Sequence, residues 1–209
     1  MRFFRRGARP AAVVSQDEVV VMYEAEGLVR PGFTTLDEAR AAIIEYVEDD
    51  DEVPVTAERA AAIVNDVWAR RKAEERSWSG LSDADRVAAA FAELEASGVV
   101  ARMSFTCCQN CGAHEIGDEV PPGASPRGYV FFHRQDAERL GEPDAALYLS
   151  YGAFSGPDLT AGLHEAEALA VGNLVTHTLE ANGLRVDWDG TLAKRIHVVD
   201  LDWRRRLPD

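Results

Sequence analysis

The chain has 209 residues, of which 46% are hydrophobic and 28% are charged, and its formal net charge is −14. This composition is typical of a globular protein, and a chain of this length can bury a hydrophobic core without disulfide bonds. It excludes disorder as the main state. Because an acidic protein repels phosphate backbones, nucleic acid is not the expected partner.

Basic residues gather at the two ends of this acidic chain. Four arginines lie within residues 2–9, and three more are residues 204–206. We interpret both groups as solvated tails. The N-terminal residues are not followed by the apolar segment of a secretory signal, and no run of eighteen apolar residues occurs. The expectation is a cytoplasmic protein that does not contact membranes.

The first half of the chain predicts helices. Apolar residues recur at helical spacing, and three of the segments begin behind a residue that favours a helix N-cap. Gly98 stands where a left-handed residue closes the last of them. The predicted helices cover residues 16–29, the segment behind Thr35, residues 56–76 and residues 82–97.

From Val99 onwards the pattern changes to short β-branched or aromatic runs bounded by Gly, Pro and Asp, which predict strands. The strands are expected at residues 99–106, 128–133, 145–151, 184–188 and 195–199. A short helix is predicted over 134–140 and a long one over 160–182. Asp189-Gly190 predicts a hairpin turn, or a longer loop because Thr191-Leu-Ala follows.

These elements predict an α+β fold, in which an N-terminal helical layer packs with a C-terminal mixed β-sheet that carries one long helix. We divide the chain into a flexible basic N-terminus (1–15), a helical region (16–98) and an α+β region (99–209). The last two regions are expected to form one structural unit. Six residues on the apolar faces of their elements are expected to share one core: Phe131, Leu149, Leu174, Val186, Trp188 and Ile196.

The strongest chemical signal is a cysteine cluster, Cys107-Cys108-x-x-Cys111, which holds every cysteine of the chain. A helix through this segment would place Cys107, Cys111 and His114 on one face. A turn would instead give Cys108-x-x-Cys111-Gly the form of a zinc knuckle, with His114 as a third ligand. The candidate metal ligands are therefore Cys107, Cys108, Cys111 and His114, and zinc is the candidate metal. Glu115 and His133 are candidate neighbours.

Two other interpretations use the same cysteines. A strand, then Cys-x-x-Cys, then a helix would place Cys108 at a helix N-terminus, where its pKa falls, although Gly112 leaves little room for a long helix. Cys108, Cys111 and His133 are then the candidate catalytic residues of a thiol enzyme. Alternatively, the cysteines pack as small hydrophobic side chains under the sheet.

His133 follows an aromatic strand and precedes Asp136 by three residues. This pair fits a general base and the residue that orients it. It also fits the first turn of a helix, with His133 bonded to a backbone carbonyl, and we favour this structural role.

Residues 82–102 have the local shape of the second helix and first wing strand of a winged helix-turn-helix domain. The helix carries Asp83, Asp85, Glu93 and Glu95 against one arginine, Arg86. Because these acids would repel DNA phosphates, we reject DNA binding and expect a protein or small-molecule partner.

Four strings together resemble an uncharacterised domain-of-unknown-function family of hypothetical proteins from high-GC bacteria. They are residues 105–112, 128–136, 147–154 and 195–205. The resemblance covers residues 16–206 and implies no particular activity, so two function classes remain. The first is a non-enzymatic binding or regulatory protein whose cluster is structural or holds zinc. The alternative is a thiol-dependent enzyme, either an oxidoreductase or a hydrolase with a cysteine nucleophile and a histidine base.

Overall fold

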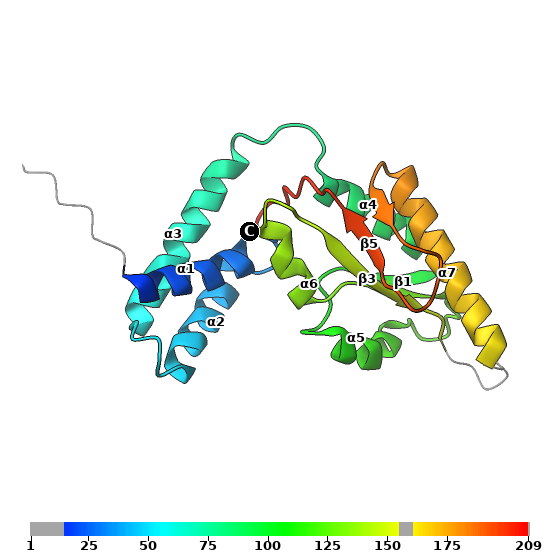
Figure 1. The fold of residues 1–209 in the computed structure, drawn as a ribbon, viewed down its shortest axis with the longest axis horizontal. Helices are drawn as coiled ribbons and strands as arrows, with labels where there is room; N and C mark the ends of the chain where they lie inside the picture. Colours follow the sequence, from blue (N-terminus) through cyan, green and yellow to red (C-terminus); the bar gives the residue numbers. More distant parts are fainter. Residues whose placement is uncertain (1–14, 155–160, 209) are drawn as a thin grey trace, which may run out of the picture.

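Helices occupy the chain up to the first strand in the computed structural model, which describes residues 15–154 and 161–208 (Figure 1). They are α1 (Gln16–Val29), α2 (Leu36–Asp49), α3 (Ala57–Glu75) and α4 (Asp83–Ala96). Each begins behind a Ser or Thr whose side chain accepts a hydrogen bond from the first turn. Gly98, at a φ of +83°, lets the chain turn from α4 into the sheet. The predicted helical half is confirmed.

The strands form one mixed sheet with the order β1-β2-β3-β5-β4. They are β1 (Val99–Arg102), β2 (Gly128–Phe131), β3 (Leu147–Gly152), β4 (Arg185–Asp187) and β5 (Ile196–Val199). Only the β1–β2 pair is parallel among these neighbours. The turn between β4 and β5 is the longer loop, because the two strands pair only up to Asp187 and His197. The predicted α+β fold with a mixed sheet is confirmed.

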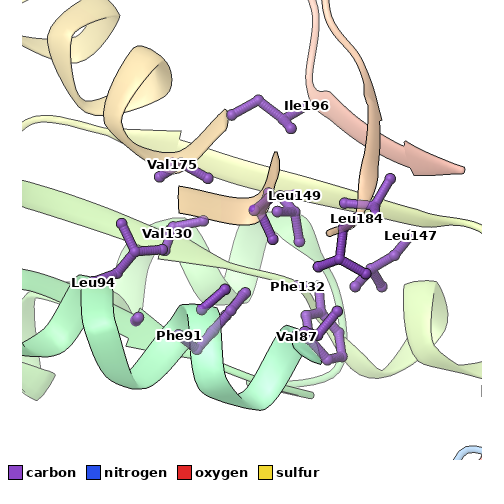
Figure 2. Close-up of a cluster of buried hydrophobic side chains, with 14 of the residues drawn as sticks. Val87, Phe91, Leu94, Val130, Phe132, Leu147, Leu149, Val175, Leu184 and Ile196 are labelled. Atoms are coloured by element: carbon purple, nitrogen blue, oxygen red, sulfur yellow. The ribbon is translucent and has the colours of Figure 1, made fainter. Parts of the chain in front are cut away.

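Helices cover the two faces of the sheet unequally. α4 and α7 (Ala161–Ala181) pack on one face, and Figure 2 shows the buried side chains between them and the strands. The other face carries α5 (Gln109–Glu115) and η1 (Ile116–Glu119) over β1 and β2. The short helix α6 (Arg134–Glu138) and η2 (Arg139–Gly141) follow β2. Thr160, the predicted start of α7, lies outside the described residues. No helix in the described ranges is long and apolar enough to span a bilayer.

The helical half contains two different cores. Helices α1, α2 and α3 enclose a core of their own, which includes Val21, Ile43 and Val64. Helix α4 belongs instead to the core of the sheet, through residues such as Phe91 and Leu94. Residue 98 therefore does not separate the two cores, because the change from one to the other falls between α3 and α4.

Five of the six predicted core residues belong to or pack against the sheet core, and one, Phe131, lies on the other face of the sheet. Leu149 and Ile196 are buried in the sheet core, and Leu174, Val186 and Trp188 pack against it half-buried. Phe131 lies on the opposite face, under α5, with Val100 and Ile116. Tyr129-Val-Phe-Phe132 is apolar at every position, so no alternation marked its faces. The register places Val130 and Phe132 in the sheet core instead.

The C-terminal arginines do not belong to a solvated tail, and that prediction was wrong. Residues 201–208, here called the C-terminal strap, run across both cores: Trp203 is buried in the sheet core and Leu207 in the core of α1–α3. Trp203 Nε1 donates to Pro31 O at 3.0 Å, and the backbone N–H of Leu207 donates to Glu75 Oε1 at 2.6 Å. Local sequence could not show this, because both of these acceptors are more than a hundred residues away from their donors. The N-terminal arginines lie outside the described residues.

Candidate metal centre

Helix α5 lies close against the sheet because of one glycine. Gly112 is buried, and a Cβ atom at this position would stand 2.4 Å from Cε2 of Phe131. Phe131 is fully buried, and Phe105 packs against its ring edge-to-face with the centroids 5.9 Å apart. The aromatic residues beneath α5 therefore fix the position of the helix, and with it the position of Cys111.

The three cysteines meet at the start of α5. Cys108 is the N-cap of the helix, Cys107 precedes it, and Cys111 is in the first turn. The Sγ atoms of Cys107 and Cys111 are 3.3 Å apart, and all three Sγ atoms lie within 4.8 Å of one another. The helix begins between Cys107 and Cys111, so the cluster is neither wholly helical nor wholly a turn.

None of these thiols is buried. Cys107 is exposed, Cys108 and Cys111 are half-buried, and all three are free of disulfide bonds. None of them belongs to a hydrophobic core. The interpretation of the cysteines as small hydrophobic side chains packed under the sheet does not fit this position.

The backbone before the cluster is held from both sides. Phe105 N donates to Phe132 O at 2.8 Å, and the N–H groups at the start of α6 bond to the carbonyls of Thr106 and Cys107 at 3.2 and 3.4 Å. Thr106 has a φ of +54°, which is unfavourable for a β-branched residue. Such a conformation persists only where surrounding contacts enforce it, so the cysteines sit on a fixed loop.

The closeness of the thiols changes their acidity. The backbone N–H of Cys111 favours the thiolate of Cys108, and the Cys111 and Cys107 side chains add to this, so the pKa of Cys108 is lowered. Hydrogen bonding to Cys107 and Cys108 raises the pKa of Cys111 to about 12. Ionisation of Cys108 is therefore favoured, whereas ionisation of Cys111 is disfavoured. A bound cation would relieve this competition, because metal ions stabilise several thiolates at once.

Neither histidine joins the cysteines. Among the residues that the structure describes, the group of close ligand atoms contains the three cysteines without His114 or His133. His114 is exposed near the end of α5, as is its neighbour Glu115. Cys107 and Cys108 lie before the first helical turn, so the helix carries His114 away from them. The close cluster therefore consists of three of the four candidate metal ligands.

His133 is the N-cap of α6. Its Nδ1 accepts a hydrogen bond from the backbone N–H of Asp136 at 3.2 Å, and its Nε2 lies 2.9 Å from Asp136 Oδ2. The neutral tautomer with its proton on Nε2 satisfies both contacts. The structural role that we favoured is the one observed, although the partner is a backbone N–H and not a carbonyl.

Sequence reasoning missed Arg195, which completes this group. Its guanidinium binds both carboxylate oxygens of Asp136, with Nη1 at 3.0 Å from Oδ1, and it also donates to Tyr148 O at 2.6 Å. Arg195 and Asp136 are 59 residues apart. No local pattern indicates such a pair; it depends on the neighbouring positions of β3 and β5 in the sheet.

Replacing His133 with asparagine is expected to weaken the dependence of stability on pH. Burial lowers the pKa of His133, the charge of Asp136 opposes this, and the charge of Arg195 adds to it. Below about pH 6.5, His133 therefore binds a proton in the unfolded chain but stays neutral in the folded protein. The free energy of unfolding consequently falls as pH falls. Urea unfolding from about pH 7.5 to about pH 5.5 measures this slope.

Asparagine at position 133 can still cap α6, so the His133→Asn variant should fold. His177→Asn is the matched control, because His177 is exposed on α7. An unchanged slope in His133→Asn, or an equal change in His177→Asn, would contradict the assignment.

A separate cleft of about 920 Å³ lies between α1, η2 and the start of the C-terminal strap. Tyr23 Oη donates to Glu142 Oε1 across it at 3.4 Å. Burial raises the pKa of Glu138 in its wall, and the charge of Glu24 adds to this. None of the three cysteines lines this cleft. The thiol chemistry is therefore confined to the surface at α5.

Comparison with known proteins identifies the family of the chain. Residues 15–207 match the domain of unknown function DUF6891, and the chain belongs to this family. No curated protein and no solved structure matches the chain. The description of the family assigns no activity.

Proposed function

We propose that this protein binds one soft metal ion, with zinc as the first candidate, through the thiolates of Cys107, Cys108 and Cys111. The observation that carries the proposal is the set of three Sγ atoms within 4.8 Å of one another. Two sulfurs bonded to a tetrahedral zinc at about 2.3 Å lie about 3.8 Å apart. The separation of 3.3 Å between Cys107 and Cys111 needs only a small opening to reach this distance. Thiolates are the ligands that select zinc and copper(I) over hard cations.

The position of the cluster favours a binding or regulatory role over a structural one. Structural zinc sites are closed by four protein ligands, whereas three thiolates leave one position for water or for a ligand from a partner. None of the three hydrophobic clusters includes a cysteine. We therefore expect the protein to fold without metal and to exchange the ion with its surroundings, as a cytoplasmic non-enzymatic protein that recognises a protein or small-molecule partner.

Zinc titration of the reduced, metal-free protein against a chromophoric chelator tests the proposal. One zinc ion per chain is expected to bind. Cys111→Ser should weaken binding at least about 100-fold, because loss of a direct ligand costs more than loss of a supporting residue. Zinc should leave the unfolding temperature of Cys111→Ser unchanged while raising that of the wild type.

His114→Ala is the matched control, since His114 lies on the same helix outside the close group. Its zinc affinity should stay within about threefold of the wild-type value, whereas a loss as large as that of Cys111→Ser would make His114 the fourth ligand. Equal zinc affinity in the wild type and Cys111→Ser would overturn the proposal.

A thiol-dependent oxidoreductase is the second candidate, because Cys107 and Cys111 are close enough to form a disulfide bond with little movement. With hydrogen peroxide as oxidant, one thiolate attacks a peroxide oxygen, and a sulfenic acid and water form. The second thiol then displaces water to give the disulfide, so two thiols and one peroxide yield one disulfide and two waters. Peptide mapping of the oxidised metal-free protein would locate this bond. Rapid, repeated turnover by a dithiol, with no zinc binding by the reduced protein, would favour the enzyme.

A further inference from the structure

A second polar pocket is lined by none of the cysteines. It is a pocket of about 300 Å³ between the loop that follows α3, the start of α4 and the C-terminal strap. Arg204, Arg205 and Arg206 line it together with Trp78 and Asp85. Three consecutive arginines around one pocket are notable in a chain whose net charge is −14.

Two of these arginines have no carboxylate partner among the residues that the structure describes. Arg204 pairs with Asp202 at 2.8 Å. Arg205 uses only its Nε, which donates to Gly32 O at 3.1 Å, and Arg206 uses only its Nη1, which donates to Glu75 O at 3.3 Å. Both Nη nitrogens of Arg205 and the Nε and Nη2 of Arg206 therefore keep donors for an added acceptor.

Arg205 is held in place before any ligand arrives. Its guanidinium lies 4.4 Å from the ring centroid of Phe33, and its side-chain stem packs on Gly32, where a Cβ atom would stand 3.0 Å from Arg205 Cγ. Gly32 also has a φ of +78°, so it meets both a backbone and a space requirement. Burial lowers the pKa of Arg205, which Asp85 opposes, so this charge is partly desolvated without being paired.

Asp85, the acid in the pocket wall, is already engaged. Its Oδ2 accepts hydrogen bonds from the backbone N–H and the hydroxyl of Ser82, both at 2.8 Å, as part of the N-cap of α4. The hydrogen bonds from Ser82 are the largest cause that lowers the pKa of Asp85, and the charges of Arg204 and Arg205 lower it further. Asp85 therefore caps the helix, and among the described residues the remaining donors of Arg205 and Arg206 have no carboxylate partner.

We propose that this pocket binds a phosphate group, with Arg205 and Arg206 as its charged ligands. Planar guanidinium forks match the oxygens of phosphate and provide short, charge-assisted hydrogen bonds. The volume of the pocket, about 300 Å³, suits a small molecule. The net charge of −14 would repel a long polyanion. Trp78 lines the same pocket and offers an aromatic contact to the organic part of a phosphorylated molecule. This inference is independent of the metal site.

Isothermal titration of the full chain with inorganic phosphate, AMP and citrate at low ionic strength tests the proposal. Phosphate or AMP is expected to bind once per chain, and Arg206→Gln should weaken binding at least about tenfold through the loss of a charged donor. Arg205→Lys keeps the charge and most of the stem but loses the fork, and a similar loss is expected. Arg127→Gln is the control, because Arg127 is exposed outside the pocket and should leave affinity unchanged.

The outcomes separate the sources of the phosphate. Tighter binding of AMP that Trp78→Phe reduces would support a phosphorylated organic ligand, and equal binding of AMP and phosphate would support free phosphate. Absence of binding at millimolar concentration, tighter binding of citrate than of either phosphate compound, or wild-type affinity in Arg206→Gln would overturn the proposal. Unfolding temperatures of all variants without ligand show whether a loss reflects the pocket or the fold.

Discussion

Replacing Trp203 with alanine is expected to lower the free energy of unfolding by about 3–5 kcal/mol, the usual cost of removing a large buried aromatic side chain. Trp203 is 6% exposed and belongs to the sheet core. Its ring lies 6.1 Å from that of Phe33, which in turn contacts Phe132 at 5.6 Å. The change also leaves Pro31 O without its buried donor, which adds to the loss. Urea unfolding followed by circular dichroism measures the effect.

Two further variants separate packing from other effects of the substitution. Leu81→Ala should change the free energy of unfolding by less than about 0.5 kcal/mol, because Leu81 is 74% exposed. Trp203→Phe keeps much of the aromatic volume and loses the hydrogen bond to Pro31, so it should fall between the wild type and alanine. A C-terminal strap that contributes little would instead leave Trp203→Ala as stable as Leu81→Ala.

The second large effect is expected at Gly112, where alanine should both destabilise the fold and weaken zinc binding. The added Cβ would stand 2.4 Å from Cε2 and 2.6 Å from Cζ of Phe131, whose buried ring has no room to retreat. Helix α5 must then lift from the sheet, at a cost of about 1–3 kcal/mol. Because Cys111 precedes Gly112, we expect zinc affinity to fall at least about tenfold. Urea unfolding of the metal-free variant and the chelator titration measure the two effects.

Gly117→Ala is the matched control from the same segment. No atom lies within 4 Å of a Cβ at Gly117. The variant should keep wild-type zinc affinity and nearly wild-type stability. If Gly112→Ala bound zinc as tightly as Gly117→Ala, the close packing of α5 on Phe131 would have no part in forming the metal site.

The helical half was predictable because its signals are local. Thr35 and Ser82 stand three residues before Glu38 and Asp85, and each pair forms the reciprocal hydrogen bonds of a capping box. These contacts lie within one helical turn, so the sequence alone specifies where α2 and α4 begin. The clustering of the cysteines was equally visible, since their closeness in space follows from closeness along the chain.

What the sequence could not specify depends on contacts between distant segments. The face occupied by Phe131 is set by strand register and by the position of α5, and Asp136 meets Arg195 only after β3 and β5 pair. The separation of His114 from the close group depends on where the helix begins, which is Gln109 and not Cys107 as in the helical interpretation. Composition indicated the basic C-terminus but not the two cores that its apolar residues enter.

The C-terminal strap also bears on how the protein is synthesised. Helices α1–α3 leave the ribosome early, yet the core between them receives Leu207 only when the C-terminal strap has been translated. Until then the buried carboxylate of Glu75 lacks a backbone donor that lies 132 residues ahead in the chain. Domains usually fold in order of emergence. Here the core of the first helices to appear is completed last, so a chain that stops short of the strap leaves apolar side chains of both cores uncovered.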